Sequence, residues 1–310
     1  MRRVPLLGAV LLLGVAVVIA VGCGGGGSGS STGSTPPSAT TEESITTSET
    51  AAAPPPASAE TIAYVEGSID EPTIFRIEAD GSHRRPLNVG GATPAWSPDG
   101  REIAVTAGVE TVAIIRANGG HQRDVGGSNF SYQPAWSPDG RRIALVEENL
   151  EEGWTALSII DVGTGKSTIL PVDVGPRDLD SYSSGYAFAP NASWSPDGTR
   201  IAFASNGIKV IELKSGRVRA LGAGTGPDWS PDGSRIAYAT GHAIAVMNAD
   251  GSHRHTIVTS ENDVVQPSWS PDATRIVYAD APEGGLHIVG ADGSNPRRLT
   301  DSGFDPDWHP

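Results

Sequence analysis

The sequence predicts an all-β protein, a six-bladed β-propeller of four-stranded antiparallel blades, from a repeated motif and from its spacing. The motif reads W-S-P-D-G at 96–100, 136–140, 194–198 and 229–233, W-S-P-D-A at 269–273, and W-H-P at 308–310. Successive Trp residues of this motif lie 40, 58, 35, 40 and 39 residues apart. A period near 40 residues is typical of propeller blades, each of which is one four-stranded unit.

Each repeat contains the same elements in the same order. A short strand with the pattern x-P-x-W leads into Ser-Pro-Asp-Gly, where Pro presets φ and Gly accepts the left-handed conformation of a tight turn. A second strand follows at once and begins at Ile62, Ile103, Ile143, Ile201, Ile236 and Ile276. A third apolar strand leads in most repeats to a Gly turn, and the polar fourth segment is typical of an outer edge strand.

The two ends of the repeat region indicate how the ring closes. The first repeat begins at its second strand, at Ile62, and the last stops after its first strand, at Trp308. The terminal strands are therefore expected to share one blade, which leaves no open sheet edge at the seam. The repeated Trp residues are expected to be structural and to pack between adjacent blades. They are Trp96, Trp136, Trp194, Trp229, Trp269 and Trp308.

Three segments are expected along the chain. Residues 1–22 are typical of a lipoprotein signal peptide, because Arg2 and Arg3 precede an uncharged apolar run that ends in small residues before Cys23. Residues 23–60 are rich in Gly, Ser, Thr and Pro and predict a disordered tether. The propeller occupies 61–310. An uncleaved membrane anchor is the alternative for the first segment, and both place a propeller, expected to be monomeric, outside the cytoplasm.

Charge and motifs exclude several classes of function. The chain has 22 Lys and Arg against 36 Asp and Glu, a net charge of −14, which argues against a nucleic-acid partner. The repeat region 61–310 has no G-x-S-x-G motif. His253 and His255 lie at an expected turn without a third metal ligand, and Asp178-Leu-Asp180 starts like a calcium loop but lacks the later ligands. We therefore expect no catalytic motif, no metal and no cofactor.

The long spacing between Trp136 and Trp194 marks the third repeat as different. Its two long loops are expected on the face of the ring opposite the Ser-Pro-Asp-Gly turns, and long loops in a compact repeat are often functional. They carry acidic, aromatic and Arg residues, which suit a binding patch: Glu151, Glu152, Trp154, Arg177, Asp178, Asp180, Tyr182, Tyr186 and Phe188. The alternative is that the insertion only covers the mouth of the channel.

The repeat x-P-x-W-S-P-D-G-x-x-I-A-F resembles that of the TolB-like, WD40-like six-bladed propellers over residues 61–310, and Ala-Val-Gly-Cys23 resembles a bacterial lipobox. The resemblance implies the propeller fold and an envelope setting, and it carries no catalytic residues. The expected function is a non-catalytic binding or scaffolding lipoprotein whose partner is an envelope protein or cell-wall polymer. The alternatives are a glycan or small-ligand sensor that uses the channel, and a propeller-type lyase, lactonase or glycosidase.

Overall fold

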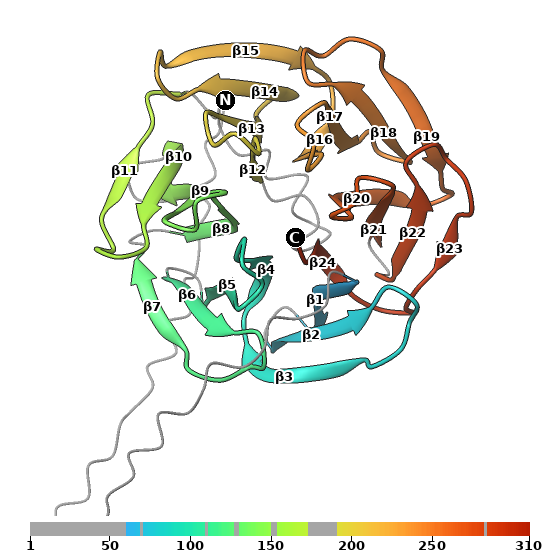
Figure 1. Cartoon of the computed structure of the whole chain (residues 1–310), viewed down its shortest axis with the longest axis horizontal. Helices are drawn as coiled ribbons and strands as arrows, with labels where there is room; N and C mark the ends of the chain where they lie inside the picture. Colours follow the sequence, from blue (N-terminus) through green and yellow to red (C-terminus); the bar gives the residue numbers. More distant parts are fainter. Residues whose placement is uncertain are drawn as a thin grey trace, which may run out of the picture. The chain divides into compact units, whose positions relative to one another are not determined.

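A computed structural model describes residues 60–68, 71–108, 111–126, 130–149, 154–172, 191–281 and 284–310. These residues form six four-stranded antiparallel sheets arranged around a central axis, as Figure 1 shows. The predicted six-bladed propeller is therefore confirmed. Among the described residues, no helix has the length and apolar character needed to cross a bilayer.

The blades follow the chain, and we number them from the N-terminus. Blade 1 contains β24 (Phe304–Trp308), β1 (Thr61–Gly67), β2 (Pro72–Glu78) and β3 (Arg85–Gly90). Blade 2 contains β4 (Ala92–Trp96), β5 (Glu102–Ala107), β6 (Thr111–Arg116) and β7 (Arg123–Gly126). Blade 3 contains β8 (Phe130–Trp136), β9 (Arg142–Asn149), β10 (Trp154–Asp161) and β11 (Ser167–Ile169).

The second half of the ring repeats this order. Blade 4 contains β12 (Ala192–Trp194), β13 (Arg200–Ala204), β14 (Ile208–Glu212) and β15 (Arg217–Gly222). Blade 5 contains β16 (Thr225–Trp229), β17 (Arg235–Ala239), β18 (Ala243–Asn248) and β19 (His255–Thr259). Blade 6 contains β20 (Asp263–Trp269), β21 (Arg275–Ala281), β22 (Leu286–Gly290) and β23 (Arg297–Arg298). In every blade the strand that ends in the motif Trp is innermost (Figure 1).

The ring closes in blade 1, where the last strand pairs with the first. Ile62 lies opposite Trp308, and Val65 lies opposite Phe304. The pairing continues past the strand, because the His309 N–H donates to the Thr61 carbonyl at 2.9 Å. The expectation that the terminal strands share one blade is therefore correct.

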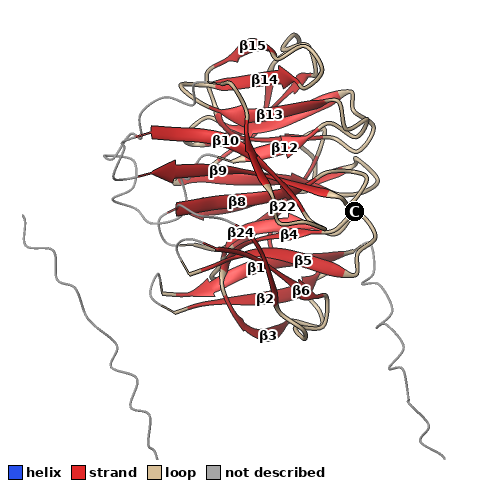
Figure 2. Ribbon diagram, turned by 90° about the vertical axis from the view of Figure 1, so that its left-hand side faces the viewer, coloured by secondary structure: helices blue, strands red, loops and turns tan. Residues whose placement is uncertain are grey.

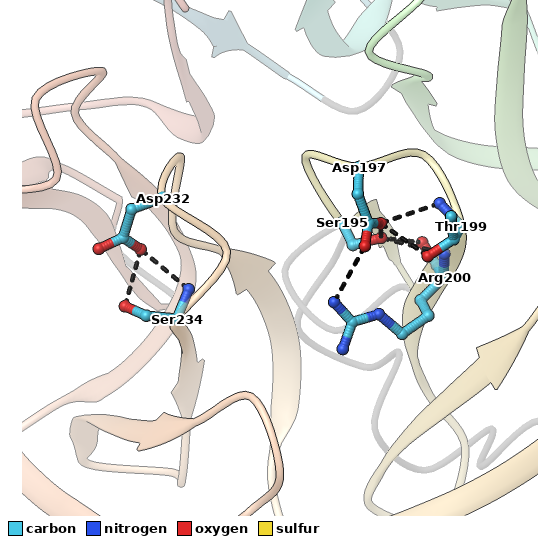
Figure 3. Close-up of polar contacts among 6 residues, drawn as sticks. All are labelled: Ser195, Asp197, Thr199, Arg200, Asp232 and Ser234. Atoms are coloured by element: carbon cyan, nitrogen blue, oxygen red, sulfur yellow. Dashed lines mark hydrogen bonds and ion pairs between the residues drawn. The ribbon is translucent and has the colours of Figure 1, made fainter.

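The Ser-Pro-Asp-Gly turns are held by their own polar side chains, as Figure 3 shows for blade 4. Asp197 Oδ1 accepts hydrogen bonds from Ser195 Oγ at 2.5 Å and from the Thr199 N–H at 3.0 Å, and Arg200 lies 3.3 Å from Oδ2. Burial opposes ionisation, but the hydrogen bonds from Ser195 and Thr199 lower the pKa of Asp197 to about 2. Asp232 is held in the same way by Ser234.

The core consists of clusters shared by neighbouring blades. Each of the six motif Trp side chains is only 3–9% exposed and belongs to a cluster built from its own blade and the preceding one. Four of these rings are also covered by an Arg from the preceding blade, with the guanidinium carbon 4.6–4.9 Å from the ring centroid, a cation–π distance. The pairs are Arg142 and Trp194, Arg200 and Trp229, Arg235 and Trp269, and Arg275 and Trp308.

Candidate functional site: the central channel

The six inner strands surround a cavity of about 370 Å³ on the axis of the ring. Every inner strand ends in its motif Trp, so residues before the Trp lie deeper than the turn face. The motif prolines two residues after each Trp also line the cavity, which therefore extends toward the turn face. These prolines are Pro98, Pro138, Pro196, Pro231, Pro271 and Pro310. The outer walls of the cavity are thus apolar and rigid.

A backbone irregularity sets which side chains line the deeper part. The residue before the inner-strand proline is left-handed in five blades, with φ between 46° and 60°: Thr93, Gln133, Gly226, Gln266 and Asp305. This conformation is unusual before proline and more so for a β-branched residue such as Thr93. The register of each of these five strands shifts at the same place, so each contains a bulge. Bulges redirect side chains, and four of the five residues, Thr93, Gln133, Gln266 and Asp305, line the cavity.

Three of these residues form a polar bridge between blades 1, 3 and 6. Asp305 Oδ1 accepts hydrogen bonds from Gln133 Nε2, at 3.3 Å, and from Gln266 Nε2. The Asp305 N–H donates in return to Gln266 Oε1 at 3.1 Å. Because Gln133 and Gln266 come from opposite positions in the ring, their bonds to one carboxylate span the axis. The bridge therefore forms a floor at this depth of the channel.

Nearer the turns, the residue between the inner-strand proline and the motif Trp is Asp307 in blade 1 and Asp228 in blade 5, and each forms hydrogen bonds to the neighbouring inner strand. Asp307 Oδ2 accepts from the Trp96 N–H at 2.6 Å, and Asp228 Oδ2 accepts from the Trp269 N–H at 2.9 Å. Asp228 Oδ1 also accepts from Ser193 Oγ at 2.9 Å. These carboxylates satisfy backbone N–H groups of the next blade, so their first role is to hold the ring together.

The channel carboxylates titrate far above the usual range of Asp. Burial raises the pKa of Asp305 to about 7, although hydrogen bonds from Gln133 and Gln266 oppose the shift. Burial likewise raises the pKa of Asp307 to about 7 and that of Asp228 to about 6. Desolvation disfavours the charged carboxylate. Within the described part of the chain, no Lys, Arg or His lines the cavity to offset it.

The structure places the sequence-predicted residues as follows. Trp154 is the first residue of β10, on the face opposite the Ser-Pro-Asp-Gly turns. Glu151, Glu152, Arg177, Asp178, Asp180, Tyr182, Tyr186, Phe188 and Cys23 lie outside the described residues. The insertion face and the lipidation site therefore stay predictions.

Sequence reasoning did not identify the channel residues, although a signal was present. The positions beside the inner-strand proline hold Asp in two repeats and Gln in two others, in strands that are otherwise apolar and buried. A polar residue at a buried position of a repeat indicates a specific partner. The sequence could not show that these partners lie in other blades.

Within the described ranges, no three His, Cys, Asp or Glu side chains are close enough to hold a metal ion. The channel carboxylates are also engaged with donors of neighbouring blades, as described above.

Comparison with known proteins decides the family. The model of the TolB β-propeller domain matches residues 61–310. The chain belongs to this family. No curated protein sequence matches this TolB-type propeller chain.

Solved structures share the fold at low identity. TolB from Acinetobacter baumannii is 20% identical, with a TM-score of 0.69, and the match covers 81% of this chain and 67% of that one. The putative TolB from Agrobacterium tumefaciens is 18% identical, with a TM-score of 0.61 and coverage of 79% and 90%. Oligogalacturonate lyase from Vibrio parahaemolyticus is 13% identical, with a TM-score of 0.52 and coverage of 79% and 80%. At these identities the likeness shows the propeller fold alone.

Proposed function

We propose that this TolB-type propeller is a non-catalytic binding or scaffolding protein of the bacterial cell envelope. It is anchored to the membrane through Cys23 and presents the loops of blade 3 to an envelope protein or cell-wall polymer. The observation that carries the proposal is the division of the ring into two unlike faces. The chain enters the ring on the turn face, and the ends of β9, β10 and β11 that border the blade 3 insertions lie on the other.

The entry point of the chain is fixed by an ion pair at the seam. Arg275, two residues after the Ser-Pro-Asp-Ala turn of blade 6, lies 2.8 Å from Glu60 Oε1. Glu60 precedes β1, so the segment that leads to the proposed anchor joins the propeller on the turn face. In this proposal the partner binds the opposite face.

Blade 3 differs from the other blades on that opposite face. β9 and β10 have 8 residues each and are the longest described strands. Figure 2 shows that their connected ends lie on the side of the ring opposite the C-terminus. The second insertion, between β11 and β12, leaves toward the same face by the order of strands in a meander. The strand ends that border both insertions therefore lie on the same face of the ring, as expected for a localised protein-binding surface.

A crosslinking experiment on intact cells tests the binding face. The full-length chain is compared with a variant in which 174–188 are replaced by a Gly-Ser linker of equal length, and thermal unfolding of both checks that the ring is intact. We expect a specific crosslinked partner that disappears with the replacement. Unchanged crosslinks on a folded variant would refute the binding face.

The anchor is tested separately with Cys23→Ser. Lipidation at Cys23 predicts that the variant loses incorporation of radiolabelled palmitate and is released from the membrane fraction. If the variant stays in the membrane fraction, residues 1–22 act as an uncleaved anchor, and the lipoprotein part of the proposal is wrong.

The channel supports a second candidate function, recognition of a small ligand. The cavity of about 370 Å³ lies within the usual range of ligand pockets, and rigid apolar walls lead to a few buried polar groups at its floor. A ligand sensor would use this channel independently of the blade 3 loops.

A further inference from the structure

The ionisable side chains that line the channel are all acidic. Its lining includes the three carboxylates Asp228, Asp305 and Asp307, and no cationic side chain of the described residues reaches it. The remaining lining is dominated by proline and tryptophan. A pocket with apolar walls and only acidic ionisable groups favours a ligand that is apolar along its length and positively charged at one end.

Two buried acceptor atoms at the floor make no hydrogen bond of normal geometry to a described residue, although the Thr93 backbone N–H is near enough to the Asp305 carboxylate to lower its pKa. They are Gln133 Oε1 and Asp305 Oδ2, on side chains that are 8% and 5% exposed. A third such acceptor, Asn191 Oδ1, belongs to the residue at the same position of the neighbouring inner strand. Buried acceptors are normally satisfied. The floor of the channel therefore has acceptors in excess and lacks donors.

From this excess we propose that the channel binds a primary alkylammonium group, with the ammonium at the Gln133–Asp305 floor and the alkyl chain between the proline rings. An ammonium group carries three N–H donors, which matches the three unpartnered acceptors. A hard metal ion such as Ca²⁺ needs six to eight oxygen ligands. The floor instead supplies amide oxygens and a single free carboxylate oxygen.

The geometry also indicates how the ammonium reaches these atoms. Gln133 Oε1 and Asp305 Oδ2 are buried, so the ammonium would reach them by displacing the Gln133–Asp305 hydrogen bond, which at 3.3 Å is long. Gly226 occupies the equivalent strand position in blade 5 and has no side chain that could compete for the acceptors.

This inference rests on the second candidate function, small-ligand recognition, and is tested by calorimetry on the full-length chain. The probes are n-pentylamine, n-pentanol as its neutral counterpart, Nα-acetyl-lysine N-methylamide and calcium chloride. We expect n-pentylamine to bind and n-pentanol to bind at least about tenfold more weakly, because a charged hydrogen bond is lost. Binding of the lysine derivative as well would identify protein side chains, rather than free amines alone, as a source of the group.

The matched variants are Asp305→Asn and Asp250→Asn. Asp305→Asn keeps an oxygen for the two Gln amides but removes the charge, and should weaken n-pentylamine about 10- to 100-fold. Asp250 lies in an exposed outer turn, where it accepts from the Ser252 N–H, and its variant should bind like the wild type.

Three results would overturn the proposal: equal affinity for n-pentylamine and n-pentanol, unchanged affinity in Asp305→Asn, or binding of Ca²⁺ without binding of the amine. The first comparison needs no variant, so it holds even if Asp305→Asn does not fold. Failure here leaves the crosslinking test of the blade 3 face untouched, because that test does not involve the channel.

Discussion

Trp229 and Trp269 offer a controlled measurement of what one indole N–H contributes to this ring. Both side chains are 4% exposed, and both are covered by an Arg at 4.7 and 4.6 Å. They differ at the indole nitrogen. Trp269 Nε1 donates to the Asp228 carbonyl at 3.2 Å, whereas Trp229 Nε1 is buried without an acceptor among the described residues. Replacement of each by Phe should therefore have unequal costs.

The expected difference follows from the hydrogen-bond energetics. Trp269→Phe loses a bond with a net value of about 0.5–1.5 kcal/mol, whereas Trp229→Phe removes an unsatisfied donor that costs about 1–3 kcal/mol. Both variants replace an indole by a smaller phenyl ring and weaken the contact with the covering Arg to a similar extent, so these costs cancel in the comparison. Trp269→Phe should thus be the more destabilising by about 1.5–4.5 kcal/mol.

Urea unfolding at equilibrium, followed by circular dichroism, measures both variants against the wild type. Trp229→Ala sets the scale, because removal of the whole side chain from an inter-blade cluster should cost about 3–5 kcal/mol. If Trp229→Phe proved as destabilising as Trp269→Phe, or more so, the assignment of the unsatisfied indole would be wrong.

Two further predictions follow from the channel and the turns. Asp305 and Asp307 have a pKa raised by burial to about 7, so the stability that they contribute is complete below about pH 4 and is lost as the pH rises to about 7. The free energy of unfolding, measured in urea at a series of pH values, should fall over this window. Asp307→Asn should make this fall with pH less steep. If the variant and the wild type lost stability equally steeply, the raised pKa of Asp307 would be wrong. Ala273 is left-handed, with φ of 56°, so Ala273→Gly should raise the free energy of unfolding by up to about 1 kcal/mol, and Gly233→Ala at the equivalent position should lower it by a similar amount. Opposite signs in thermal unfolding support the strained turn, and two destabilised variants would argue against it.

The strands, turns and closure of the ring could be predicted from the sequence because their causes are local and repeated. Ser195 and Asp197 lie two residues apart, and the Ser195 hydroxyl donates a hydrogen bond to the Asp197 carboxylate. The turn can therefore be predicted from the five residues of the motif. Ring closure followed from the strand at which each terminal repeat stops, at Ile62 and Trp308, and the two residues do lie opposite each other.

The channel was decided only by the tertiary structure. Gln133 and Asp305 are 172 residues apart in the chain, and nothing local to either residue indicates the other. They meet because six blades bring the same strand position to one axis, and because a left-handed residue before proline, which local preference opposes, redirects each side chain into the ring. The sequence by itself therefore determined the blades and their order, whereas the closed ring decided which polar side chains share the space at its centre.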